Sequence, residues 1–454
     1  MKPTAPSAHA VRSEPGASLP RLLDKRVQRA VLLTSLTFVL AAKPVLALDG
    51  WITVDELKPP VPTADPAVTG PGISGVSHDV GVFGSNVFSV GSARYDANAS
   101  PPAYSAIIRK SPSSGNANTW TEVDYYAPTG WPYRKYRGFG SGADGTLYAA
   151  GDLFRPLPDN QWKSAWMVQK SINGGENWVE DEIYQENGQE WDKAACFDIK
   201  GHPNGDVYAV GGSVTTGFSW EVRKKSAGAT SVFTRVDKVG PRSMATYAHA
   251  VAFNGTDILV VGRVDSGSGG LWTVRRSIDN GVTWATVDTF ADGKGAWLSE
   301  AMGIAVNPRT GAIYVSGWAS QPVKNRTVYN WVVRRSLNRG TTWTTVDRFG
   351  AQAGAFDTIT VQARGVTVAP SDTVFVVGVT PPPRKLMVRK GTTSSTGVMT
   401  WVVSDQLVDD LVPPRESTGY GIAADASGNI YCSGQSKIAA DGSGFFITRK
   451  LSVP

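Results

Sequence analysis

Ser277-Ile278-Asp279-Asn280-Gly281-Val282-Thr283-Trp284 is the stretch that decides the fold, because imperfect copies of this octet recur along the chain. Close copies occupy residues 171–178 and 336–343, and degenerate copies lead to Trp120, Phe233 and Trp401. The close copies follow a strand-like segment whose end carries Arg or Lys, and a second short strand comes after them. Self-similarity at a fixed period indicates a repeat architecture.

A second pattern precedes the octets: a small apolar strand, a turn, and a strand that ends in glycine. One copy joins residues 303–306 to residues 313–317. The seven glycines at these strand ends are Gly91, Gly151, Gly211, Gly262, Gly317, Gly378 and Gly434. Glycine inside a strand is typical of a bulge or of a close backbone approach. The small apolar strands suit inner strands that crowd around an axis.

The spacing of the repeats predicts the fold class. The aromatic residue that starts the last strand of each repeat recurs at steps of 51 to 59 residues. Four short antiparallel strands fit into one step. The 49 glycines, the 15 tryptophans and the apolar share of 41% agree with many short strands around an ample core. We therefore predict an all-β, seven-bladed β-propeller of four-stranded blades over residues 74–454.

The last repeat lacks an outer strand, because the sequence stops at Pro454 soon after residues 447–450. Trp51-Ile52-Thr53-Val54-Asp55 matches residues 343–347, an outer strand, in register. We predict that residues 51–57 complete the seventh blade and cover its exposed edge. Residues 48–73 would then form the closing strand and a linker, which holds five Pro and two Gly between residues 59 and 72.

Residues 1–47 have the pattern of a secretory signal peptide. Lys25, Arg26 and Arg29 precede the apolar stretch 30–42, and small residues follow it. The stretch is short for a membrane anchor, which is the alternative interpretation. We expect a secreted or periplasmic protein that is monomeric and makes no membrane contact after cleavage.

Removal of that segment changes the charge balance. Seven of the 45 basic and two of the 39 acidic residues lie in it, which leaves 38 and 37 and a net charge of +1. No electrostatic case for nucleic-acid binding remains, so nucleic acid is not an expected partner.

Cys196 and Cys432 both lie in apolar strand patterns. A disulfide is possible in an exported protein, but we expect two buried thiols in separate repeats. No Cys-x-x-Cys occurs and the four histidines are scattered, so no zinc or other metal is expected. No phosphate-loop or His-Glu-x-x-His motif points to a cofactor, and none is expected.

The octet resembles the Asp-box, or BNR repeat, of sialidases and related secreted propellers. Residues 277–284 match it at every defined position, and the copies at 171 and 336 have Asn for Asp. The strand ending at Gly434 also resembles bacterial propeller repeats. The resemblance implies a hairpin between the third and fourth strands, on the face away from any active site. Asp279 would then bond turn amides, Gly281 would take the positive-φ position and Trp284 would pack between blades.

Alignment of the inner strands predicts which side chains ring the channel mouth. The aligned position holds His78, Arg137, Ala195, His249, Met302, Arg364 and Tyr420. Two His and two Arg would suit an anionic or polyhydroxyl ligand, and the alternative is a wet channel without a ligand. The loops that lead into these strands carry Trp131, Trp191 and Trp297, which could stack on sugar rings or pack loops together. Our candidate ligand-binding residues are His78, Arg137, His249, Arg364, Tyr420, Trp131, Trp191 and Trp297.

A glycosidase needs two carboxyl groups or an equivalent pair, and Glu300 and Asp357 are the candidates on these loops. A sialidase would hold its substrate with three arginines, for which only Arg137 and Arg364 qualify, with Tyr420 as a conceivable nucleophile. The sialidases that the octet resembles also have six blades, not seven. We expect a secreted binding module for extracellular glycans or protein partners. The alternative is an Asp-box-type glycoside hydrolase.

Overall fold

The computed structural model describes most of the chain from Asp49 onward. The described residues are 49–57, 74–94, 104–112, 114–157, 162–187, 193–214, 217–228, 231–240, 246–324, 326–353, 361–407, 415–438 and 444–452. They form 28 strands and no helix, so no helix long and apolar enough to cross a membrane occurs in this part. The expected signal segment, residues 1–47, and the linker, residues 58–73, lie outside the described residues.

Six of the blades are consecutive in the sequence. Blade 1 holds β2 (Gly75–Phe83), β3 (Asn86–Ala93), β4 (Ser105–Ser111) and β5 (Thr121–Tyr126). Blade 2 holds β6 (Tyr133–Ser141), β7 (Leu147–Pro156), β8 (Trp162–Ser171) and β9 (Val179–Tyr184). Blade 3 holds β10 (Lys193–Gly201), β11 (Val207–Val214), β12 (Phe218–Lys225) and β13 (Phe233–Val239). Blade 4 holds β14 (Tyr247–Asn254), β15 (Asp257–Asp265), β16 (Gly270–Ser277) and β17 (Ala285–Phe290). Blade 5 holds β18 (Ser299–Val306), β19 (Ile313–Val323), β20 (Arg326–Ser336) and β21 (Thr344–Ala353). Blade 6 holds β22 (Gln362–Val368), β23 (Val374–Val379), β24 (Leu386–Thr393) and β25 (Met399–Gln406).

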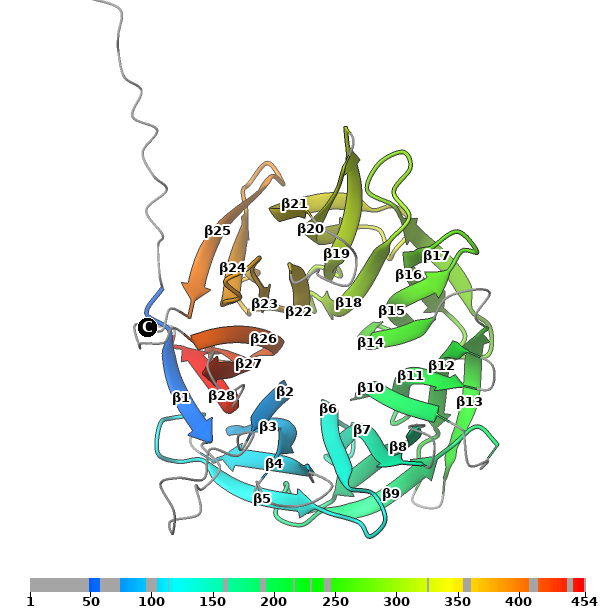
Figure 1. Ribbon diagram of the computed structural model, residues 1–454, viewed down its shortest axis with the longest axis vertical. Helices are drawn as coiled ribbons and strands as arrows, with labels where there is room; N and C mark the ends of the chain where they lie inside the picture. The colour runs from blue at the N-terminus through cyan, green and yellow to red at the C-terminus, as the bar shows by residue number, and fades with distance from the viewer. Residues whose placement is uncertain are drawn as a thin grey trace, which may run out of the picture. The chain divides into compact units, whose positions relative to one another are not determined.

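Blade 7 joins the two ends of the described chain. It holds β26 (Arg415–Ala424), β27 (Ile430–Ile438), β28 (Gly444–Leu451) and, as its outer strand, β1 (Ile52–Leu57). Each of the seven sheets is antiparallel and four-stranded, and the first strand of each blade lies nearest the axis (Figure 1). The predicted seven-bladed propeller is confirmed.

The closing strand has the predicted register. Ile52 pairs with Lys450 and Thr53 with Arg449, and a bulge follows before Asp55. Strand β21 pairs with β20 in the same way, with a bulge between Thr345 and Asp347. Trp51 is only 9% exposed, packs between blades 6 and 7, and donates Nε1–H to Ser404 Oγ at 2.9 Å. The ring is therefore closed by a strand from the other end of the sequence.

Large side chains from neighbouring blades fill the spaces between the sheets. Trp166, Trp220, Trp272 and Trp331, each on the third strand of its blade, are fully buried against the next or preceding sheet. Truncation of a buried Trp costs about 3–5 kcal/mol, so these contacts carry much of the stability. Cys196 and Cys432 are free, buried and in separate blades, as expected.

The octet forms a hairpin between β16 and β17, as its resemblance implies. The Asp279 carboxylate accepts bonds from the Thr283 N–H and hydroxyl, and Ser277 Oγ accepts from Gly281 N–H at 2.8 Å. Asn280 and Gly281 both have positive φ, at 59° and 86°. Trp284 packs against the core between blades 3 and 4. The octet is thus a structural device at the end of the blade away from the strand-two-to-three turns.

Conserved spacing in the repeat also produces ion pairs between blades. In each, an Arg on the third strand of one blade binds an Asp on the fourth strand of the preceding blade. The five pairs are Arg109–Asp55, Arg275–Asp237, Arg334–Asp288, Arg389–Asp347 and Arg449–Asp405. Arg223 and Glu182 form the equivalent contact between blades 2 and 3. The Arg-rich strand ends that precede the octets therefore tie the blades together.

Candidate functional site

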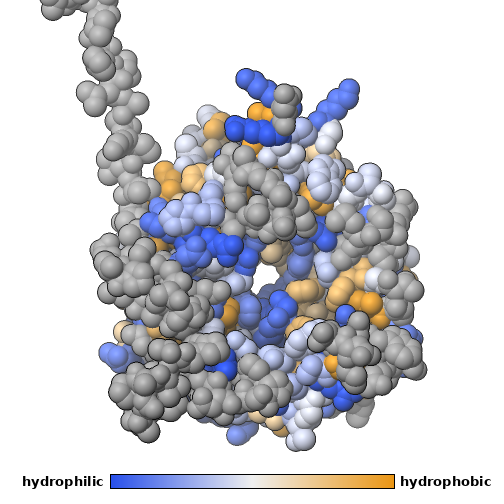
Figure 2. All heavy atoms as spheres, viewed as in Figure 1, coloured by the Kyte–Doolittle hydropathy of each residue, from blue (hydrophilic) through white to orange (hydrophobic). Residues whose placement is uncertain are grey.

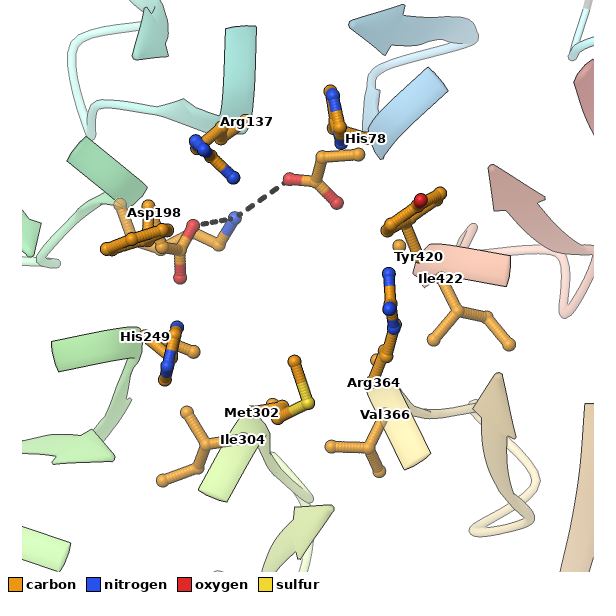
Figure 3. A pocket seen from close by; sticks show the side chains of 17 residues that line it. His78, Arg137, Asp198, His249, Met302, Ile304, Arg364, Val366, Tyr420 and Ile422 are labelled. Carbon is orange, nitrogen blue, oxygen red and sulfur yellow. Dashed lines mark ion pairs between the residues drawn. The ribbon is translucent and has the colours of Figure 1, made fainter. Parts of the chain in front are cut away.

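Every inner strand is interrupted by a β-bulge at the same place. The bulged residues, here called the bulge ring, are His78, Arg137, Phe197, His249, Met302, Arg364 and Tyr420. Each is half-buried, whereas the residue before it is buried. Because a bulge leaves one residue unpaired and re-aims its side chain, the bulged residues reach the channel, as Figure 3 shows for His78, Arg137, His249, Met302, Arg364 and Tyr420.

A glycine in each second strand, which the sequence pattern placed at the strand end but which lies inside the strand, makes this bulge possible. A Cβ on Gly317 would lie 2.0 Å from Glu300 O, and one on Gly151 would lie 1.9 Å from Lys135 O. The backbone carbonyl of the residue two before the bulged residue therefore occupies the space that a Cβ at the glycine position would need. The expected role of these glycines, a bulge with close backbone approach, is confirmed.

One position of the predicted ring differs. The sequence alignment placed Ala195 there, but the bulged residue of blade 3 is Phe197, while Ala195 is buried and pairs with Gly212. Phe197 precedes Gly211 by 14 residues, as Arg137 precedes Gly151. The apolar run at residues 194–197 misled an alignment anchored on the first apolar residue, and the spacing to the glycine is the signal that identifies Phe197.

The bulge ring lines a cavity of ≈ 160 Å³ in the central channel. Figure 2 shows an opening at the centre of the molecule, with hydrophilic residues around much of its rim. The rings and cations of the bulge ring contact one another. Arg364 lies over the Tyr420 ring at 4.4 Å, and His78 meets the same ring edge-on at 5.1 Å. Arg137 lies over Phe197 at 4.9 Å.

The two arginines of the ring differ in how their charge is balanced. Arg137 binds the carboxylate of buried Asp152. Arg364 donates Nε and Nη2 to the neutral amide oxygen of Gln362, at 3.0 and 2.9 Å. Within the described residues no carboxylate forms an ion pair with Arg364. Its positive charge is therefore held in place with no direct carboxylate partner among the described residues, and it acts on the Glu300 carboxylate only at longer range.

The two histidines also differ. Burial and nearby positive charge, chiefly that of Arg137, lower the pKa of His78 well below its usual value. The imidazole of His78 is therefore neutral at pH 7 and can either donate or accept a hydrogen bond. His249 instead contacts the carboxylate of Glu300 through Nε2.

Glu300 lies behind the bulge ring and is not among the residues that line the cavity. Burial by itself would raise the pKa of Glu300, but the contact with His249 and the positive charges of Arg263 and Arg364 outweigh it and lower the pKa. An ionised carboxylate has no proton to donate, so Nε2 of His249 carries the hydrogen. Glu300 therefore positions His249 and fixes its tautomer.

A partly buried cluster of three charged side chains also lines the channel cavity. Lys200 Nζ lies 3.0 Å from Asp198 Oδ1 and 3.8 Å from Asp79 Oδ2 (Figure 3). Both carboxylates also accept backbone N–H groups of the neighbouring inner strand, from Val251 to Asp198 and from Phe139 to Asp79, each at 3.0 Å. The cluster joins the inner strands of four blades. Sequence reasoning missed it because its members come from two separate blades.

The aromatic and acidic loop candidates have separate locations. Trp131 packs against the core between blades 1 and 2, with Arg155 over its ring at 5.7 Å. Trp297 is 42% exposed, and neither residue lines the channel cavity. Trp191 and Asp357 lie outside the described residues. In the described part, no group of three or more His, Cys, Asp or Glu side chains is arranged to hold a metal ion.

Comparison with known proteins identifies no family. No family model matches this sequence, and no curated protein matches it either. Similar solved structures include a protein of unknown function from Dyadobacter fermentans, with 14% identity, a TM-score of 0.45, and coverage of 89% of this chain and 99% of that one. The α-L-arabinofuranosidase Arb93A from Fusarium graminearum shares 13% identity over 71% of this chain and 94% of its own, with a TM-score of 0.45.

A sialidase from Trypanosoma rangeli shares 14% identity over 70% of this chain and 56% of its own, with a TM-score of 0.39. With TM-scores below 0.5, these similarities say nothing about ligand or activity. The assignment of this chain to the seven-bladed β-propellers rests on its own strand pairing.

Proposed function

We propose that the protein is a secreted, monomeric binding module whose ligand is an extracellular glycan with a carboxylate group. The carboxylate binds at the bulge ring. The observation that carries the proposal is Arg364, a half-buried guanidinium that faces the cavity without a carboxylate partner among the described residues. A charge kept partly out of water without a partner is costly, and an anionic ligand would compensate it.

The neighbours of Arg364 fit the same ligand. The Tyr420 ring makes a cation–π contact with the Arg364 guanidinium, and neutral His78 can donate a hydrogen bond to a sugar hydroxyl or accept one from it. His249, whose tautomer Glu300 fixes, adds a second imidazole at the same level. A carboxylate flanked by hydroxyls would use each of these groups.

A glycoside hydrolase is the alternative function, and the arrangement of the carboxylates favours binding over hydrolysis. The two carboxylates that line the cavity, Asp79 and Asp198, both bind Lys200 and backbone amides. Burial raises the pKa of Asp79 to about 6, so Asp79 could hold a proton, but Asp198 is held by Lys200 and a backbone amide, which leaves no second free carboxylate in the cavity lining. Glu300 contacts His249 and lies outside the cavity lining.

Isothermal titration calorimetry with single sugar acids tests the proposal. The probes are D-galacturonate and D-glucuronate, with D-galactose and D-glucose as uncharged references. We expect the acids to bind, the neutral sugars to bind at least tenfold more weakly, and Arg364→Gln to remove the difference. Arg335→Gln, at the octet end of β20, is the control and should bind as the parent does. Absence of binding by both acids would overturn the proposal, and turnover of aryl-glycosides abolished by Glu300→Gln would favour the hydrolase.

A further inference from the structure

A second cavity, of ≈ 390 Å³, adjoins the bulge ring between blades 1 and 2 and shares His78 with it. Its walls are mostly aromatic: Tyr104, Tyr133, Phe154 and Trp162. We call it the aromatic cleft. Ligand pockets usually measure about 300–1,000 Å³. The aromatic cleft is in that range and the channel cavity, at ≈ 160 Å³, is below it.

The walls of the aromatic cleft are held in place before any ligand arrives. Tyr104, from blade 1, accepts the N–H of Arg134 and donates its own N–H to Pro132 O, at 3.0 and 2.9 Å. The Tyr104 and Tyr133 rings stack at 5.9 Å, and Trp162 meets Tyr133 edge-on at 5.3 Å. Trp162 is nevertheless 41% exposed. An exposed indole on a rigid support is a preformed contact surface.

A buried arginine, Arg134, also lines the aromatic cleft. Arg134 is 9% exposed, and its Nε has no hydrogen-bond partner within the described residues. Its Nη2 donates to Pro128 O at 2.7 Å, and no carboxylate in that part of the chain forms an ion pair with it. Burial lowers the pKa of Arg134, although Tyr125 and Tyr126 act in the opposite direction. Lys135, on the same strand, binds Asp152 at 3.6 Å.

Resting on the proposed function, we infer that the aromatic cleft is a second sugar subsite and that the ligand is an oligosaccharide of acidic sugars. One acid group binds Arg364 in the channel, and the neighbouring sugar lies in the cleft with its own acid group toward Arg134. A sugar ring suits these walls because its C–H face can lie on Tyr133 or Trp162 while its polar edge meets the cation. His78, common to both cavities, is the junction between the two subsites.

The experiment compares oligomers with single sugars by isothermal titration calorimetry of the whole protein. The probes are trigalacturonate and a hyaluronan tetrasaccharide, with D-galacturonate and D-glucuronate as single-sugar references. We expect at least one oligomer to bind tenfold or more tightly than its single sugar. Trp162→Ala and Arg134→Gln should each abolish most of that gain and leave the single-sugar affinity unchanged. Leu337→Ala, which removes an apolar side chain 68% exposed in the octet at residues 336–343, is the control and should change neither.

The outcomes separate the two proposals. If single acids bind but the oligomers bind no more tightly, or if Trp162→Ala and Arg134→Gln leave the gain intact, the second subsite is refuted while the first stands. If neither single acids nor oligomers bind, the proposed function fails as well. Binding of a random Glu-Tyr copolymer in place of every sugar would identify the cleft as a peptide site and overturn the sugar assignment.

Discussion

Arg109 holds Asp55 by two hydrogen bonds, Nε to Oδ2 at 2.6 Å and Nη2 to Oδ1 at 2.8 Å, across the junction where the two ends of the ring meet. Asp55 comes from the closing strand β1 and Arg109 from blade 1. The same contact joins Arg275 to Asp237 within the continuous part of the ring. Closure of the ring therefore repeats the interface used between other blades.

Loss of the closing ion pair should destabilise the protein strongly. Asp55→Asn leaves the Arg109 guanidinium, whose side chain is 12% exposed, without its carboxylate. Removal of one partner of a buried pair costs about 3–5 kcal/mol, and we expect about 3 kcal/mol here. Thermal unfolding measures the loss.

Asp237→Asn is the matched variant within the ring and should cost a similar amount. Deletion of residues 48–58, which removes the whole strand, should lower the melting temperature by many degrees or abolish folding. A deletion variant that melts with the parent would show that β1 does not close the ring.

The interface between blades 1 and 2 departs from the repeat in a way that predicts a double substitution. Gln169 occupies the third-strand position that holds Arg in the other blades. Asp124, the fourth-strand acid of blade 1, instead accepts a hydrogen bond from the Tyr136 hydroxyl, at 2.6 Å to Oδ2. The inner-strand residue before the bulge is small in the other blades: Ser77, Cys196, Ala248, Ala301, Ala363 and Gly419. We expect Gln169→Arg alone to destabilise, because buried Tyr136 fills the space that the guanidinium needs.

Tyr136→Ala with Gln169→Arg should restore the ion pair of the other interfaces. The expected coupling between the two substitutions, measured in a double-mutant cycle of chemical unfolding, is favourable by about 2 kcal/mol. Additive single effects would show that Tyr136 does not replace the arginine.

Asp124 makes stability depend on pH. Burial, with the nearby charge of Glu122, raises the pKa of Asp124 to about 6, whereas the unfolded value is 3.8. The folded state therefore binds the proton more tightly, and the stabilisation present below pH 3.8 is lost as pH rises through about 6. Asp124→Asn should remove this loss and raise the free energy of unfolding at pH 7 by about 1–2 kcal/mol, after allowance for solvent screening.

The measurement is the free energy of unfolding between pH 4 and 7 for the parent and the variant. Their difference should grow with pH over that interval. Glu186→Gln is the contrasting variant and should destabilise at pH 7, because it breaks the contacts with Lys238 and Arg235 that lower the pKa of Glu186 to about 2. A pH-independent difference for Asp124→Asn would contradict the raised pKa.

The glycine opposite each bulge should tolerate no side chain. Gly317→Ala places a Cβ 2.0 Å from Glu300 O, so the backbone of β18 has to move. We expect a loss of about 3 kcal/mol or more in thermal or chemical unfolding. Gly240→Ala is the control, because no atom of the described residues lies within 4 Å of its Cβ, and it should stay within about 0.5 kcal/mol of the parent. Equal stability of the two variants would mean that the bulge is not constrained by the glycine.

The fold was predictable because its devices are local and repeated. The octet and the glycines of the second strands recur at similar intervals along the chain, so one copy predicts where the others lie. Residues 51–55 match residues 343–347, which predicts their place in the last blade. Even the register of the closing strand could be predicted, since its bulge, before Asp55, lies at the position that aligns with the bulge before Asp347 in β21.

The site was predictable only in part. The alignment found six of the seven bulge-ring residues, and it failed at Phe197, where a buried run hid the register. It could not show which charges are neutralised. Arg137 and Arg364 are alike in sequence position, yet Arg137 forms an ion pair with Asp152 and Arg364 binds a neutral amide. Such ion pairs, like the contacts around Arg134, depend on which residues the tertiary structure brings together, and the sequence pattern does not show this.

A crystal structure of the protein with bound D-galacturonate or D-glucuronate tests the central claim most directly. The account predicts the carboxylate of the sugar at the bulge ring, within hydrogen-bond distance of the Arg364 guanidinium and with a sugar hydroxyl on His78. Density for the sugar at the octet end of the blades, or in the channel without contact to Arg364, would contradict it.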